Sequence, residues 1–154
     1  MKNIGWSVAA LLLSASIGFA QGEALAEAQK TLKEKYPAAN SVKWEKETDG
    51  GWEAEFTING NETSVEFDSK GTWKQTETEI ETSDLPEAVL DAIKTKYAEY
   101  SVEEAEMVET ADGEVVYEVD FKKGKTEMEL LFASDGSVIK TMNEDEDEEE
   151  VDED

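Results

Sequence analysis

The chain has 154 residues, with 14 lysines against 39 aspartates and glutamates, and its formal net charge at pH 7 is −25. It contains no histidine, cysteine or arginine, which excludes Ser-His-Asp and Cys-His nucleophile systems, His or thiolate zinc sites, disulfides and haem attachment. The charge also argues against nucleic acid as a partner, because that binding needs lysine and arginine to neutralise phosphates.

The first 20 residues have the layout of a secretory signal peptide. Lys2 precedes an apolar run from Ile4 to Phe19, and the small residues Gly18 and Ala20 stand at the −3 and −1 positions. An uncleaved transmembrane anchor is the alternative, but the run is shorter than the roughly 20 residues that a bilayer span needs. We therefore expect cleavage after Ala20, export to the periplasm or the medium, and no stable membrane insertion of the mature chain.

Residues 21–80 begin with a helical segment and continue with strand-like alternation. Leu25, Ala28, Leu32 and Tyr36 recur at helical spacing, and Pro37 ends the segment because the residue before a proline avoids the helical region. Apolar and polar residues then alternate on both sides of an Asn-Gly hairpin turn at 59–60. A fourth short strand is expected around Trp73. The residues expected to face the core are Val42, Trp44, Trp52, Ala54, Phe56, Ile58, Thr63, Val65 and Phe67.

Residues 81–142 show the same order of elements. Asp84 is the expected N-cap of a second helix, Pro86 lies in its first turn and Glu87 completes a capping box. The apolar stripe of this helix and the core-facing positions of the following strands are Val89, Ile93, Tyr97, Val115, Tyr117, Val119, Phe121, Met128, Leu130 and Phe132.

The two segments also match residue by residue. The run 52–56 recurs at 117–121, and the turn Phe67–Gly71 recurs as Phe132–Gly136. We therefore predict an α+β fold of two tandem units, 21–80 and 81–142, each with one helix and a four-stranded antiparallel sheet. The period-2 pattern indicates sheets with one covered face and one wet face.

Several of these motifs resemble those of the PepSY-like, beta-lactamase-inhibitor-like proteins exported by Bacteroidetes and relatives. They are Lys35-Tyr36-Pro37 at a helix end, Leu85-Pro86 at a helix start, and the two turns Phe67–Gly71 and Phe132–Gly136. The resemblance covers roughly residues 22–142 and implies a saddle whose sheet surface grips a partner protein. It implies no catalytic residues. Ala98 and Ala133 depart from the pattern, where a proline and an aspartate would be expected.

The C-terminal segment 143–154 is predicted to be a disordered acidic tail, since ten of its last eleven residues are acidic. It lacks the glycine and the alternating ligands of an EF-hand loop, so a defined calcium cage is not expected. Diffuse counterion binding is the simpler interpretation of such a block.

The candidate binding residues are acids on the wet phase of the strands, together with Trp73 as a partly exposed aromatic contact. Trp44 and Trp52 are expected in the core instead. We expect a non-enzymatic binding module without cofactor or metal that engages a basic protein or peptide, with an inhibitory role among the possibilities. Low-affinity divalent cation (calcium) binding or buffering by the acidic face and tail is the alternative. The candidate acids are Glu53, Glu55, Glu66, Glu118, Asp120, Glu127 and Glu129.

Carboxylate pairs such as Glu53 with Glu55, or Glu118 with Asp120, are the available material for acid–base chemistry. Retaining glycosidases use two carboxyl groups about 5–5.5 Å apart, a separation that alternate residues on one strand can reach. A catalytic acid also needs a desolvated setting that raises its pKa, and an open sheet face is expected to offer little shelter. A hydrolase is therefore not expected.

Overall fold

The computed structural model describes residues 20–143. The predicted signal peptide and acidic tail lie outside this range, apart from Ala20 and Asn143 at its two ends. In chain order the elements are α1 (Ala20–Lys35), β1 (Lys43–Lys46), β2 (Trp52–Ile58), β3 (Asn61–Phe67), β4 (Trp73–Glu79), a 3-10 turn η1 (Thr82–Asp84), α2 (Glu87–Lys96), β5 (Ser101–Thr110), β6 (Val115–Lys123), β7 (Thr126–Ala133) and β8 (Val138–Asn143).

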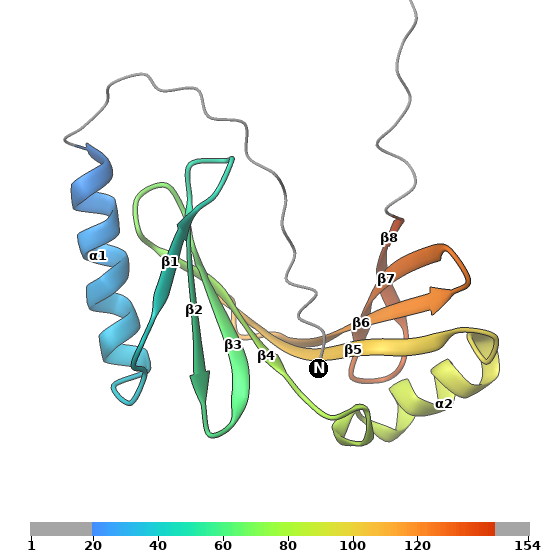
Figure 1. Cartoon of the computed structure of the whole chain (residues 1–154). Coiled ribbons are helices and arrows are strands. Elements are labelled where there is room, and N and C mark those ends of the chain that lie inside the picture. The colour runs from blue at the N-terminus through green and yellow to red at the C-terminus, as the bar shows by residue number, and fades with distance from the viewer. Residues whose placement is uncertain (1–19, 144–154) are drawn as a thin grey trace, which may run out of the picture.

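All eight strands form one antiparallel sheet in which the spatial order follows the chain order. The halves are joined by the pairing of β4 with β5, where Gln75–Glu79 lies opposite Glu106–Thr110. Figure 1 shows that the sheet bends around these two strands and that α1 and α2 lie on the outer side of the bend. The α+β class is confirmed, and the strands predicted as two sheets form one continuous sheet.

Each helix covers its own hydrophobic cluster on the same face of the sheet. Under α1, Ala28 and Leu32 pack with Ala54, Phe56, Val65 and Phe67. Under α2, the buried residues are Leu85, Val89, Ala92, Ala105, Val119, Phe121, Leu130 and Phe132. The alternation of strand side chains between two faces places these residues together. The core predicted from the period-2 pattern is confirmed apart from Val115, which is 43% exposed at the start of β6 and belongs to neither cluster.

The start of α2 differs from the prediction. Pro86 rather than Asp84 occupies the N-cap position, and no side chain caps the helix. Leu85 is extended, with φ −60° and ψ 146°, because the ring of the following proline disfavours the helical region. Asp84 therefore belongs to the preceding 3-10 turn, where its N–H donates to the Glu81 carbonyl at 2.8 Å.

Each helix contacts one glycine of a turn of the sheet, and the missing side chain allows a close approach. Gly71, in the turn from β3 to β4, lies so close to α1 that a Cβ atom would stand 2.2 Å from the Ala24 carbonyl oxygen. Gly136, in the turn from β7 to β8, lies equally close to α2, with 2.4 Å to the Ala88 oxygen. Both have positive φ, +83° and +82°, which favours glycine on backbone grounds as well.

The two turns differ in how an aspartate stabilises them. Asp68 Oδ1 accepts hydrogen bonds from the backbone N–H groups of Lys70 and Thr72, both at 2.8 Å. Ala133 stands at the equivalent place, and Asp135 takes over by accepting from the Ser137 N–H at 2.9 Å and the Ser137 hydroxyl at 2.6 Å. The departure noted at Ala133 therefore leaves the second turn intact.

We predict that Gly71→Ala lowers the free energy of unfolding by about 3–4 kcal/mol, because the new Cβ meets helix backbone and the φ is unfavourable. Gly113→Ala is the matched control, since Gly113 has φ +87° but nothing within 4 Å of its Cβ position. It should cost only about 1–2 kcal/mol. Urea denaturation measures both, and equal losses would contradict the role given to the close approach.

Candidate functional site

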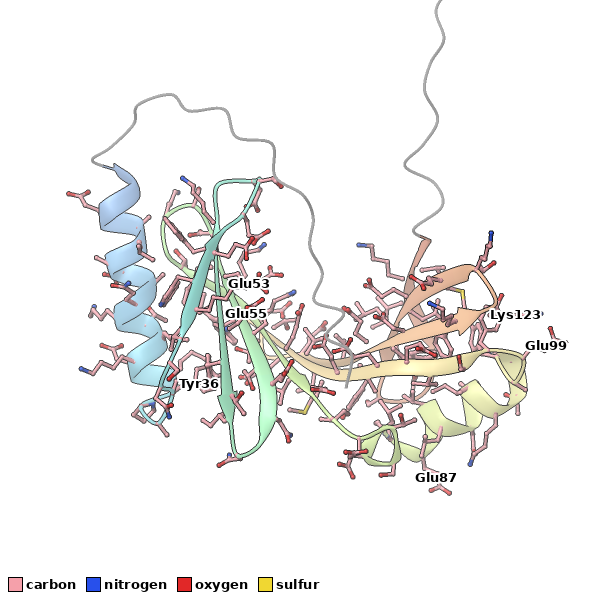
Figure 2. The ribbon with its side chains drawn as sticks, in the orientation of Figure 1. Tyr36, Glu53, Glu55, Glu87, Glu99 and Lys123 are labelled. Atoms are coloured by element: carbon pink, nitrogen blue, oxygen red, sulfur yellow. The ribbon has the colours of Figure 1, made fainter. Side chains whose placement is uncertain are left out.

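The face of the sheet turned away from both helices, called the open face below, lies on the inner side of the bend in Figure 1. Register and alternation bring all seven predicted acids to this face, because each alternates with the core-facing residues of its strand. Figure 2 shows Glu53 and Glu55 on β2, whereas Tyr36 lies at the C-terminal end of α1. The seven predicted acids on the open face are Glu53, Glu55, Glu66, Glu118, Asp120, Glu127 and Glu129.

Trp73 lies apart from these acids. Its indole Nε1 donates to Thr76 Oγ1 at 3.1 Å, and the Lys35 ammonium is 3.5 Å from the ring centroid. Trp73 packs against the cluster under α1, as do Trp44 and Trp52. The core placement of Trp44 and Trp52 is confirmed, and the structure does not bring Trp73 to the open face.

Three further acids, which sequence reasoning missed, complete the centre of the open face. Glu106 on β5 lies opposite Glu79 on β4 and Glu118 on β6. Glu104 lies opposite Asp120, which in turn lies opposite Glu129 on β7. Glu77 on β4 lies opposite Val108 on β5. The alternation of Glu104 and Glu106 with Ala105 and Met107 was a usable signal for β5, but the neighbours of Glu77 depend on the pairing of β4 with β5.

The central carboxyl groups hold their protons far more tightly than ordinary glutamates do. Burial raises the pKa of Glu118 to about 9, helped by the charges of Glu129 and Glu77. Burial and the charge of Glu77 raise the pKa of Glu106 to about 8. Burial, with Glu66 and Glu53 nearby, raises the pKa of Glu77 to about 7.

Burial also raises the pKa of Glu104, with Asp120 as the charge that contributes most, and Glu129 itself is only 6% exposed. These acids shelter one another from water on the inner side of the bend. The expectation that the open face offers little shelter was therefore wrong. The reason is that several strands contribute carboxyl groups to one crowded surface, which one strand taken alone cannot reveal.

Lysines hold the acids at the margin of the open face. Lys43 pairs with Glu55 at 2.7 Å and Lys74 pairs with Glu66 at 3.0 Å, while Lys122 pairs with Glu127. The Ser64 hydroxyl donates to Glu53 Oε1 at 2.6 Å. Within residues 20–143, no ion pair joins a lysine to Glu77, Glu104, Glu106 or Glu118.

Three carboxyl groups of the open face approach one another closely enough to surround a cation in principle. One oxygen from each of Glu118, Asp120 and Glu129 lies within 4.8 Å of the others. Acidic surfaces show such crowding without any ion, so the spacing alone identifies no metal site.

The raised pKa values also meet one requirement of a catalytic acid, but the shape of the surface favours binding. A polar pocket of about 270 Å³ lies at the bend. Its acidic lining consists of Glu79, Glu81, Asp84, Glu103 and Glu104, and neither Glu106 nor Glu118 is part of it. The groups with the most altered pKa values therefore lie on a broad face, which suits contact with a macromolecule better than enclosure of a small substrate.

Comparison with known families and structures now identifies the fold. The family model described as "Putative beta-lactamase-inhibitor-like, PepSY-like" matches residues 48–140. The chain belongs to the PepSY-like family. The resemblance noted in the sequence is thereby confirmed, and among curated proteins none matches this PepSY-like chain.

Solved structures agree with this assignment. A DUF2874 family protein from Bacteroides ovatus ATCC 8483 is 29% identical with a TM-score of 0.69, over 76% of this chain and 85% of that one. A BLIP-like protein from Bacteroides fragilis NCTC 9343 is 28% identical with a TM-score of 0.66, over 77% and 84%. A protein from Bacteroides eggerthii DSM 20697, described as among "putative periplasmic proteins", is 23% identical with a TM-score of 0.70, over 76% and 86%.

Across the described residues, neither helix has the length and apolar character needed to cross a bilayer.

We predict that the PepSY-like chain loses stability as pH rises from 5.5 to 9. The folded pKa values of Glu77, Glu106 and Glu118 lie above the ordinary value of 4.5, so in this window the folded state binds more protons than the unfolded state. The free energy of unfolding must then fall as pH rises. Urea denaturation at pH 5.5, 7 and 8.5 measures the slope.

Glu118→Gln should remove part of that slope, raising the free energy of unfolding at pH 8.5 by about 1–2 kcal/mol relative to wild type. This figure discounts the pKa shift because the side chain is only partly buried. Glu87→Gln, on the exposed surface of α2 (Figure 2), is the control and should leave the slope unchanged. A wild-type stability that rises through this window would contradict the assignment.

Proposed function

We propose that this chain is a non-enzymatic binding module outside the cytoplasm, and that its open face binds a basic protein or peptide. The observation that carries the proposal is the gathering of carboxyl groups from β2 through β7 on one inward-curved face, with lysine partners at the margin. Such a surface attracts cations, accelerates encounter with a basic partner and makes association sensitive to salt.

Membership of the PepSY-like family and likeness to a BLIP-like protein support a protein as the partner. Export is supported by the description of the Bacteroides eggerthii structure and by the layout of residues 1–20. Inhibition of the captured protein is part of the proposal, because a partner covering a broad sheet face excludes other molecules from its own surface.

We also propose that the two helix-plus-four-strand segments are tandem units. The matching close approaches of Gly71 to α1 and Gly136 to α2 support this division. The two units then contribute different halves of a single binding face.

The test is comparative capture from an extract of the native host at low ionic strength. The triple variant Glu53→Gln, Glu66→Gln, Asp120→Asn removes charge from the open face. The triple variant Glu23→Gln, Glu34→Gln, Glu87→Gln removes the same charge from exposed helix positions. We predict that a basic protein is retained by wild type and by the helix variant, and that the open-face variant binds it about tenfold more weakly.

A tenfold loss corresponds to about 1.4 kcal/mol, the amount expected when a few partly exposed ion pairs are lost. The affinity should also fall as salt is raised from 50 to 300 mM. Equal weakening by both triple variants would show that net charge, and not the open face, decides binding, and would contradict the proposal.

Divalent-cation binding, the alternative function, is tested by calorimetric titration of the same three proteins with calcium. A millimolar isotherm that is unchanged by both triple variants but lost when the acidic residues of 144–154 are replaced would place cation binding in the tail. The proposal for the open face requires no calcium for capture of the basic partner, so chelator should leave that capture unchanged.

A further inference from the structure

The centre of the open face holds a group of glutamates on three adjacent strands: Glu77 on β4, Glu106 on β5 and Glu118 on β6, called the carboxyl triad below. Glu106 and Glu118 are direct cross-strand neighbours, and residues in that relation have Cβ atoms about 4.5–5.5 Å apart. Glu77 lies opposite Val108, so it is a diagonal neighbour of Glu106, at a separation of about 7–8 Å. Like charges this close repel one another on a partly buried surface, so ionising all three together is costly.

The surroundings of the triad add to that cost. The next row holds Glu104, Asp120 and Glu129 as cross-strand neighbours. Lysines on the same face are engaged at its margin or stand on β8. The charged groups facing the triad from the neighbouring strands are Lys43, Glu45, Glu47, Glu53, Glu55, Glu62, Glu66, Lys74, Glu79, Glu104, Asp120, Lys122, Glu127, Glu129 and Lys140.

Of these fifteen groups, eleven are acids, so protonation is the main way in which the free protein can relieve the repulsion. The triad side chains are only partly exposed, which limits screening by water. One hydrogen bond favours a charged form, from Gln75 Nε2 to Glu77 Oε1 at 2.7 Å. At neutral pH the remaining members of the triad are therefore mainly neutral carboxylic acids.

We propose that binding of a cationic partner to the open face expels protons from the carboxyl triad, so that affinity for the partner rises with pH through the neutral range. This inference rests on the proposed function and adds its regulation. A guanidinium or ammonium group placed over the triad favours the ionised form of each carboxyl. The protons pass to the buffer, and the neutral acids of the triad become carboxylates paired with the cations of the partner.

The direction of the effect follows from linkage between proton binding and partner binding. Because the bound state holds fewer protons than the free state, raising the pH favours the bound state. Glu106 and Glu118, with pKa values of about 8 and about 9, are the main proton donors at pH 7.5. About one to two protons should therefore be released per partner bound, and the dissociation constant should fall at least roughly tenfold between pH 6.5 and 8.5.

The probe is an acetylated and amidated decaarginine peptide, whose guanidinium groups do not titrate in this range, so any proton released comes from the protein. Isothermal titration of the full chain in HEPES, Tris and imidazole buffers at pH 7.5 gives the number of protons from the dependence of the heat on buffer ionisation. The test variant is Glu77→Gln, Glu106→Gln, Glu118→Gln, which keeps the shape of the triad but removes its titration. The control is the helix variant Glu23→Gln, Glu34→Gln, Glu87→Gln.

The expected result is release of about one to two protons by wild type and the helix variant, and release near zero with a nearly flat pH dependence in the triad variant. Binding to wild type that is weakened by the open-face variant yet releases no protons would overturn this inference and leave the proposed function standing. Binding that is insensitive to the open-face variant would overturn both. Carbon-13 NMR titration of the free protein is the independent check, and triad carboxyl groups that titrate near pH 4.5 would overturn the inference whatever the peptide does.

Discussion

The pairing of β4 with β5 is the contact on which the rest of this structure depends. Five residue pairs, from Gln75 with Thr110 to Glu79 with Glu106, join two segments that each have their own helix and hydrophobic cluster. Without these backbone hydrogen bonds the acids of β4 and those of β6 would belong to separate surfaces. With them, Glu77, Glu106 and Glu118 occupy adjacent strands of one face.

The helices decide which face carries the charge. Each helix can lie close against the sheet because the turn that it contacts has a glycine, Gly71 or Gly136, at the point of contact. A side chain at either position would collide with the helix backbone. Most apolar residues of the strands then turn toward the helices to leave water. Strand geometry sends the alternate residues to the opposite face, and in this chain those residues are mostly glutamates.

The crowding that results has opposite consequences for stability and for binding. Carboxyl groups that hold protons at neutral pH avoid mutual repulsion, which keeps the bent sheet stable despite the net charge of −25. The same groups become carboxylates when cations approach. An acidic surface of this kind therefore has a charge that depends on what lies against it, which is why we propose that its binding of a basic partner is coupled to pH.

The local elements can be predicted from the sequence, because periodicity, turn residues and proline positions act over short distances. Leu32, Val65 and Phe121 were placed in the core from spacing alone, the seven acids were placed on the wet phase, and short motifs at Tyr36-Pro37 and in the two turns sufficed to indicate the family. The N-cap of α2 was misplaced because the restriction that Pro86 imposes on Leu85 outweighed the capping pattern at Asp84. Long-range packing alone joins the two sheets into one, places Trp73 on the helix side, and brings Glu77, Glu106 and Glu118 together. The physical reason is that a carboxyl group's pKa depends on neighbours brought in by strand pairing, and pairing between strands some thirty residues apart leaves no periodic signal in either strand.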